Sequence, residues 1–258
     1  MHILLTNDDG ITSRGLFQAK QALERHGTVA VIAPDSNRSG ASRSITLSRS
    51  LHVEEVELRD GSKGFATDGT PVDCVRFGDL GLVGERPDLI VSGINYGYNL
   101  GDDVTYSGTV AAAFEGILLG IPGVAISQGA PTASGSDFRH HASYDFGPAA
   151  DFLGRLVGEV IEHGIPDGTI LNVNVPSEPV GVGIGRLGKR IYRDRLELES
   201  AVEGRRRYRI YGDDVSYHDE PGTDFRAIAE GRISVTPIHL DLTSTPGIDA
   251  LGAWSLVE

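Results

Sequence analysis

The chain has 258 residues, of which 40% are hydrophobic and 23% are charged, a composition typical of a globular protein rather than a disordered one. Its formal net charge of −13 repels the phosphate backbone of nucleic acids, which excludes DNA and RNA as expected partners. No apolar run approaches the roughly 20 residues of a membrane helix, and the single cysteine, Cys74, rules out an intrachain disulfide. These properties predict a cytoplasmic protein that binds neither membrane nor nucleic acid.

Short apolar segments alternate with helical ones through the first two thirds of the chain. Residues 2–6 (HILLT) are predicted to form a buried strand, and residues 13–27 a helix that ends at a glycine. The same patterns recur as strands at 28–34, 87–93, 121–127 and 169–176 and as helices at 109–120 and 144–164. This alternation is typical of a mostly parallel sheet with helices on both faces. We therefore predict an α/β fold with a three-layer core.

The pattern changes after residue 176, where glycines become frequent and the segments shorten. Residues 206–212 (RRYRIYG) alternate like one strand of a hairpin, and residues 233–243 are typical of a strand followed by an extended tail. No linker rich in proline and serine separates this part from the rest, so a single domain is expected. We predict an α/β catalytic core over residues 1–176 and, over residues 177–258, a β-hairpin extension with a helix/strand tail. Such an extension is a candidate swapped arm that packs on a neighbouring subunit.

Candidate ligands for a divalent cation lie in the loops after the predicted strands, where open parallel sheets bind their ligands. Two adjacent carboxylates, Asp8 and Asp9, follow the first strand, and Gly10 permits the turn that brings both toward one partner. Hydroxyl groups follow the second strand in residues 34–42, and amides follow the third in residues 94–109. Hard cations such as Mg²⁺, Mn²⁺ and Ca²⁺ prefer oxygen ligands of these kinds. A dication between the aspartates would also relieve their mutual repulsion.

The start of the helix predicted at 109–120 offers a second element of the site. Ser107, Gly108 and Thr109 precede or open this helix, and free N–H groups at such a position attract anions. Taken alone, an Asn-Asp-Asp-Gly string forms a plain surface turn more often than a metal site. A capped helix start, taken alone, more often only packs on the sheet than binds an anion. Together, a carboxylate-bound metal and a helix start favour a phosphate group as the ligand.

Four segments resemble, in the same order, the SurE (survival protein E) family of nucleotidases. They are NDDG (7–10), PDSNRSGAS (34–42), SGINYGYNLGDDVTYSGTVAAAFEG (92–116) and DFRAIAEGRISVTPIHLDLT (224–243). The resemblance implies a Rossmann-like core and a metal-dependent 5′-nucleotidase, a hydrolase that removes phosphate from nucleoside 5′- and 3′-monophosphates. In some members of the family, the phosphatase activity extends to short-chain polyphosphate. It also implies a homodimer or homotetramer built by exchange of C-terminal elements.

The resemblance further implies one divalent cation per subunit, Mg²⁺ or Mn²⁺, with Ca²⁺ as a further option. The ligands that it implies are Asp8, Asp9, Ser39 and Asn95. The residues that it places near the phosphate are Ser107, Gly108 and Thr109.

A mechanism follows as a hypothesis. The metal lowers the pKa of a bound water, which attacks phosphorus. One of the catalytic aspartates, Asp9 in preference to Asp8, accepts the proton of that water. The side chain of Asn99 and the donors at the helix start stabilise the charge on the phosphate oxygens.

Two other interpretations compete with this one. Phosphoryl transfer through an aspartyl-phosphate usually requires two aspartates separated by one residue, whereas here they are adjacent. A non-catalytic module that senses a nucleotide or metal and forms an oligomer stays open as the alternative. The chain has no Gly-x-x-x-x-Gly-Lys-Ser/Thr motif and no Gly-x-Gly-x-x-Gly after its first strand, so ordinary nucleoside triphosphate or dinucleotide binding is not expected.

Overall fold

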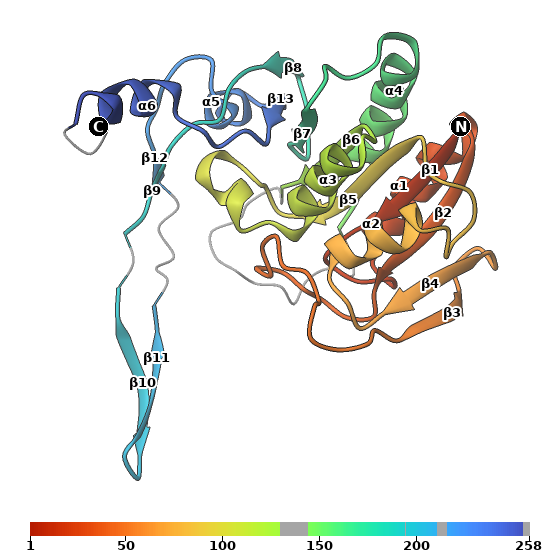
Figure 1. Ribbon diagram of the computed structural model, residues 1–258, viewed down its shortest axis with the longest axis horizontal. Coiled ribbons are helices and arrows are strands. Elements are labelled where there is room, and N and C mark those ends of the chain that lie inside the picture. Colours follow the sequence, from red (N-terminus) through yellow and green to blue (C-terminus); the bar gives the residue numbers. More distant parts are fainter. Residues whose placement is uncertain (130–143, 194, 211–215, 255–258) are drawn as a thin grey trace.

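The computed structural model describes residues 1–129, 144–193, 195–210 and 216–254, which contain a central sheet covered by helices on both faces (Figure 1). The sheet has nine strands in the order β3-β4-β2-β1-β5-β6-β7-β13-β8. Their bounds are β1 His2–Thr6, β2 Thr28–Pro34, β3 Val53–Glu57, β4 Lys63–Thr67, β5 Leu89–Tyr96, β6 Gly123–Gln128, β7 Thr169–Val175, β8 Gly181–Ile184 and β13 Arg232–His239. The pairs from β4 through β7 are all parallel, which confirms the predicted α/β fold.

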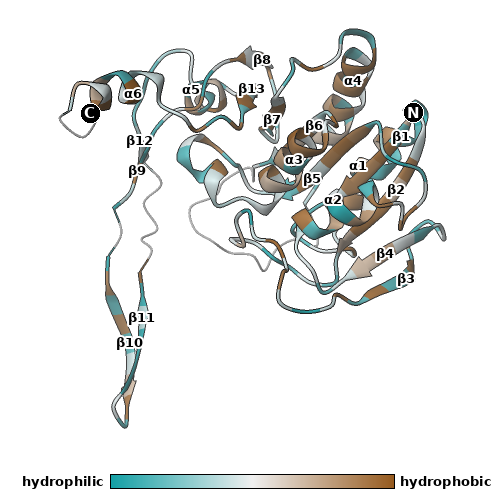
Figure 2. Ribbon diagram, in the orientation of Figure 1, coloured by the Kyte–Doolittle hydropathy of each residue, from teal (hydrophilic) through white to brown (hydrophobic). Residues whose placement is uncertain are grey.

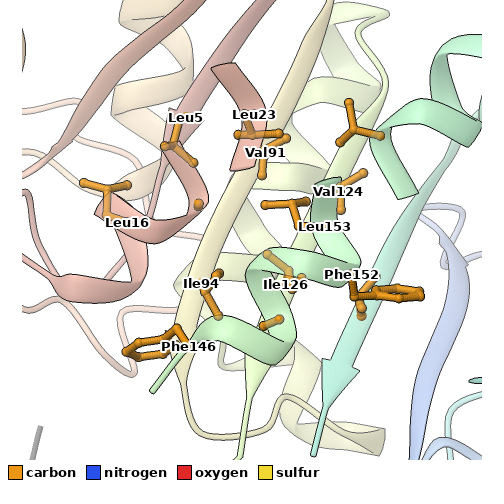
Figure 3. Close-up of a cluster of buried hydrophobic side chains, with 14 of the residues drawn as sticks. Leu5, Leu16, Leu23, Val91, Ile94, Val124, Ile126, Phe146, Phe152 and Leu153 are labelled. Carbon is orange, nitrogen blue, oxygen red and sulfur yellow. The ribbon is translucent and has the colours of Figure 1, made fainter. Parts of the chain in front are cut away.

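Two helices cover each face of this sheet. The first face packs against α1 (Arg14–Leu23) and α4 (Gly147–His163), and the second against α2 (Pro71–Asp79) and α3 (Gly108–Leu119). Figure 3 shows the buried cluster on the first face, where side chains of α1 and α4 meet those of β5 and β6. Hydrophobic residues are concentrated in the central strands and in the helices that cover them (Figure 2). The predicted three layers are therefore present.

Beyond β7, part of the chain adds strands to the central sheet and part of it forms a separate ribbon. Strand β13 pairs antiparallel with β7 and parallel with β8, so two strands after residue 176 belong to the central sheet. In contrast, β10 (Glu197–Val202) and β11 (Arg205–Arg209) form a two-stranded ribbon whose residues are all exposed. Figure 1 shows this ribbon projecting away from the sheet and its helices. The hairpin strand predicted at 206–212 is confirmed by β11, and residues 211 and 212 lie outside the described residues.

The remaining elements of the extension are short. Strands β9 (Arg190–Ile191) and β12 (Ser216–Tyr217) pair at the base of the ribbon, and the helices are α5 (Asp224–Ala229) and α6 (Thr245–Gly252). Among the described residues, no helix has the length and apolar character that crossing a bilayer requires.

Three elements between β2 and β5 were not predicted from the sequence. Strand β3 (VEEVE) lies at the sheet edge with most of its side chains exposed, so it lacks the apolar run that marks the central strands. Strand β4 (KGFAT) contains a glycine and only one large apolar residue. Helix α2 has nine residues and begins at Pro71 after a capping box between Thr70 and Asp73. Such short elements carry little periodic signal.

The packing of α3 on the sheet depends on the absence of a side chain at Gly116. A Cβ at this position would lie 2.6 Å from the carbonyl oxygen of Ile121. At Gly158 on α4, by contrast, the nearest atom would be 3.7 Å away, on the side chain of His26.

We expect Gly116→Ala to lower the free energy of unfolding by about 1–3 kcal/mol, because the backbone around Ile121 must move to admit the methyl group. The matched variant Gly158→Ala should raise the free energy of unfolding by up to about 1 kcal/mol, through helix propensity alone. Urea unfolding of both variants measures the difference. Equal effects of the two substitutions would contradict this account of the helix–sheet contact.

Candidate active site

The Asn7-Asp8-Asp9-Gly10 segment is a turn that starts directly after β1. The side chain of Asn7 closes it, because its Oδ1 accepts a hydrogen bond from the Gly10 N–H at 3.1 Å and its Nδ2 donates to the Gly10 carbonyl at 3.1 Å. Gly10 has a φ of 101°, a left-handed conformation that favours glycine. The Asn7 Nδ2 also donates to the Ser13 hydroxyl at 2.7 Å, which fixes the turn to the start of α1. Both carboxylates therefore leave the strand at the rim of the sheet.

Asp8 is enclosed by the start of α3. Its side chain is 3% exposed; Oδ1 accepts from the Thr109 hydroxyl at 2.5 Å and Oδ2 from the Thr109 N–H at 3.1 Å. Burial raises the pKa of Asp8, whereas the hydrogen bonds from Thr109 oppose this rise. A Cβ at Gly108 would lie 2.9 Å from Asp8 Oδ2, so only glycine permits this approach. The N–H and the hydroxyl of Thr109 are therefore both occupied by the Asp8 carboxylate.

Asp9 lies on the more open side of the turn. Its Oδ2 accepts from the Tyr96 N–H at 3.1 Å, and its Oδ1 accepts from Asn37 Nδ2 at 3.4 Å. Burial, together with the neighbouring charge of Asp8, raises the pKa of Asp9 to about 7. Two carboxylates are therefore held close enough to oppose each other's ionisation, which is the situation that a bound dication relieves.

The other two predicted metal ligands come from the neighbouring loops. Asn95 is 8% exposed near the end of β5, and its Nδ2 donates to the Gly97 carbonyl at 2.9 Å; no donor within the described residues reaches its Oδ1. Ser39 is exposed, and its N–H donates to Asn37 Oδ1 at 2.8 Å. Its loop is fixed beside the turn, because the Arg38 N–H donates to the Asp8 carbonyl at 2.7 Å.

These oxygen atoms fit a hard divalent cation better than a soft one. Within the described part of the chain, no group of three or more His, Cys, Asp or Glu side chains is placed to hold a metal ion. The candidate set combines two carboxylates with neutral oxygens from an amide and a hydroxyl, a mixture that suits Mg²⁺, Mn²⁺ or Ca²⁺. The ligand roles of Asp8, Asp9, Ser39 and Asn95 stay predictions.

The residues predicted to contact phosphate lie at the same rim. Ser107 caps α3 by accepting a hydrogen bond from the Val110 N–H at 3.1 Å. Asn99 is 8% exposed, and its Nδ2 donates to the Ser127 hydroxyl at 2.8 Å. Its main-chain N–H donates to Asn174 Oδ1 at 2.8 Å, which anchors the loop to β7. Contact of these side chains with phosphate stays a prediction.

Three residues of the site were missed by the sequence analysis. Asn37 links Asp9 to the Ser39 loop, and the main chain of Tyr96 holds Asp9. Asp224 has no exposed surface and accepts from the N–H groups of Gly101, Gly188 and Phe225 at 2.7, 2.8 and 2.8 Å. The Asn-x-Ser spacing of Asn37 and Ser39 is a usable signal for a local side-chain turn. No local pattern identifies Asp224 as buried.

A pocket of about 410 Å³ opens beside Asp9. Besides Asp9, its walls are formed by Thr12, Ser13, Arg14, Gly15, Asn37, Arg59, Tyr96 and Phe146. A second pocket of about 580 Å³ lies against the start of α3 and includes Arg43, Thr105 and Ser107. The first pocket thus borders Asp9, whereas the second borders the helix start and is lined by neither Asp8 nor Asp9.

The chain is similar to known proteins of one family over most or nearly all of its length. The family model described as "Survival protein SurE" matches residues 3–194. A "5′-nucleotidase SurE" of Rubrobacter xylanophilus is 51% identical over 99% of this chain and 98% of that protein, and one of Geobacter sulfurreducens is 45% identical over 99% and 94%. The crystal structure of the Sure protein from Aquifex aeolicus superposes with a TM-score of 0.79 at 38% identity, covering 97% of this chain and 98% of that one.

We expect the metal-free protein to lose stability, relative to its Asp9→Asn variant, as the pH rises from about 4 to about 7. Folding raises the pKa of Asp9 from its ordinary value of 3.8 to about 7, so the folded protein binds this proton more tightly than the unfolded chain does. The resulting stabilisation is complete below the lower value and is lost as the pH passes the higher one. Urea unfolding of both proteins in chelator across this range measures it. A stability difference that does not change with pH would contradict the raised pKa.

Proposed function

The chain belongs to the SurE family, and on this premise we propose that it is a 5′-nucleotidase. The proposed reaction is the metal-dependent hydrolysis of nucleoside 5′- and 3′-monophosphates, with short-chain polyphosphate as a further substrate. One observation supports this most strongly: the adjacent carboxylates Asp8 and Asp9 are held at the rim of the sheet beside the start of a helix. Such a rim is where open α/β sheets bind ligands.

The residues that would hold the cation are Asp8, Asp9, Ser39 and Asn95. A divalent cation bound there would supply charge neutralisation for the phosphate and would lower the pKa of a water molecule. Asp8 is the more buried of the two carboxylates and is fixed by Thr109, so its role is to hold the ion in place. Asp9 borders the 410 Å³ pocket, which makes it the carboxylate placed to accept the proton of the attacking water.

The phosphate would lie against the start of α3. The Gly108 N–H at this helix start, like that of Thr109, is directed at the Asp8 carboxylate and opposes the rise in its pKa that burial causes. The Ser107 side chain borders the neighbouring 580 Å³ pocket, and Asn99 is held nearby by Ser127 and Asn174. We assign phosphate binding to Asn99, Ser107 and Gly108. Thr109 contributes by keeping Asp8 in position.

The extension is proposed to serve assembly. The β10–β11 ribbon buries none of its residues against its own chain, although Leu198, Val202 and Tyr208 are apolar or aromatic and are 52%, 67% and 42% exposed. Exposed apolar side chains on a projecting element are typical of an interface between subunits. We propose that residues 1–176 form the catalytic core, that residues 177–258 form the extension, and that the ribbon exchanges between subunits of a homodimer or homotetramer.

Phosphate release from 5′-AMP, 5′-GMP and 3′-AMP tests the activity. We expect release with Mg²⁺ or Mn²⁺ and none in excess EDTA, because the carboxylate pair needs a dication to bind a phosphate dianion. Asp8→Asn should lower kcat/KM at least about 100-fold, as expected for loss of a ligand that orients the metal. The control Asp151→Asn, on the exposed face of α4, should retain full activity. Full activity of Asp8→Asn, or release that is insensitive to EDTA, would refute the metal site, and absence of release would favour the non-catalytic sensor.

A further inference from the structure

The 410 Å³ pocket beside Asp9 combines features that a phosphate alone does not require. Its volume falls within the range of about 300–1,000 Å³ that is typical of small-molecule sites. Its lining includes the aromatic residues Tyr96 and Phe146 and, from the β3–β4 hairpin, Arg59. The pocket thus combines a carboxylate, aromatic residues and a guanidinium group in one lining.

The aromatic side of the pocket is rigidly supported. Tyr144 packs edge-to-face against both Tyr96 and Phe146, with ring centroids 4.8 and 4.7 Å apart. Phe146 is 4% exposed and lies next to Ile94 at the end of the buried cluster (Figure 3). The first turn of α1 approaches the backbone of β5 closely, since a Cβ at Gly15 would lie 2.1 Å from the Ile94 carbonyl oxygen. A planar ring that enters the pocket can therefore contact the partly exposed Tyr96, whose ring is supported by this aromatic cluster.

Arg59 is held at the rim without a neutralising partner. Its Nη2 donates to the Thr12 carbonyl at 3.0 Å, and within the described residues its guanidinium forms no ion pair. The adjacent carboxylate, Asp60, is instead paired with Lys20 at 2.6 Å. In a chain of net charge −13, a guanidinium left unpaired at a pocket rim is available to a ligand. Guanidinium groups bind ring nitrogens and carbonyl oxygens and also stack on aromatic planes.

We propose that this pocket is the nucleoside subsite and that Arg59 is a specificity-determining residue, which contacts the base rather than the phosphate. This inference rests on the proposed nucleotidase activity and adds the position of the leaving group to it. The phosphate lies at the inner end next to Asp9, and the base lies between the aromatic side and the guanidinium of Arg59. An adjoining apolar cavity of about 350 Å³ shares Thr12, Ser13 and Arg59 with the pocket, so Arg59 stands where the two meet.

The test compares a substrate that has a base with one that lacks it. Arg59→Gln removes the charge but keeps an amide that can still donate to the Thr12 carbonyl. We expect KM for AMP and GMP to rise about tenfold, the effect of losing one charged contact, with kcat unchanged and with unchanged kinetics on ribose 5-phosphate. Lys63→Gln is the matched control, because it removes a charge from the same hairpin at a side chain that is 75% exposed and lies outside the pocket.

A second variant blocks the space instead of removing a contact. Thr12 is exposed at the pocket wall, and Thr12→Trp should raise KM for nucleotides while sparing ribose 5-phosphate. If both variants leave the KM for nucleotides unchanged, or alter both substrates equally, the subsite is not here, although the nucleotidase activity stands. If the wild-type protein cleaves nucleotides but not ribose 5-phosphate, a base-binding subsite is required, and the KM values of the variants for nucleotides locate it. A wild-type protein that releases phosphate from neither substrate would overturn the proposed function, and the subsite with it.

Discussion

The candidate site depends on one contact, in which the side chain of Asp8 accepts two hydrogen bonds from Thr109. The contact joins the end of β1 to the start of α3, and the two residues are 101 positions apart in the chain. Burial alone would favour the protonated form of Asp8, but the donors of Thr109 and the positive end of the helix favour its charged form. With Asp8 fixed in this way, the turn directs Asp9 toward Tyr96 and Asn37. The position of the Asp9 carboxylate therefore depends on that of Asp8.

Support for the site also comes from the far end of the chain. Asp224, at the start of α5, accepts a hydrogen bond from Gly101 in the loop that carries Asn99 and from Gly188 after β8. Gly101 can approach so closely only because it lacks a side chain, since a Cβ there would lie 2.5 Å from the Phe225 ring. The extension therefore contributes a buried carboxylate to the position of a loop at the rim, in addition to its exposed ribbon.

The sequence predicted the central strands and the rim loops because their signals are local. Apolar runs such as HILLT mark buried strands, and the carboxylates of Asp8 and Asp9 stand directly after one. The edge hairpin β3–β4 has no such run, so it and Arg59 were not predicted. Neither the burial of Asp224 nor the occupation of Thr109 by Asp8 could be read from the chain, because each depends on partners more than 30 residues away. Contacts between residues so far apart in the chain produce no periodic pattern in the local sequence.

The origin of Arg59 has a consequence for how such an enzyme diversifies. The carboxylates follow β1 and the neighbouring amide belongs to β5, two central strands whose side chains are packed on both faces, so substitutions there disturb the fold. Arg59, in contrast, lies in the turn of a hairpin at the sheet edge, where insertions and replacements are tolerated. With the proposed role of Arg59, substitutions in this peripheral loop would change which leaving group is accepted and would leave the proposed metal ligands unchanged.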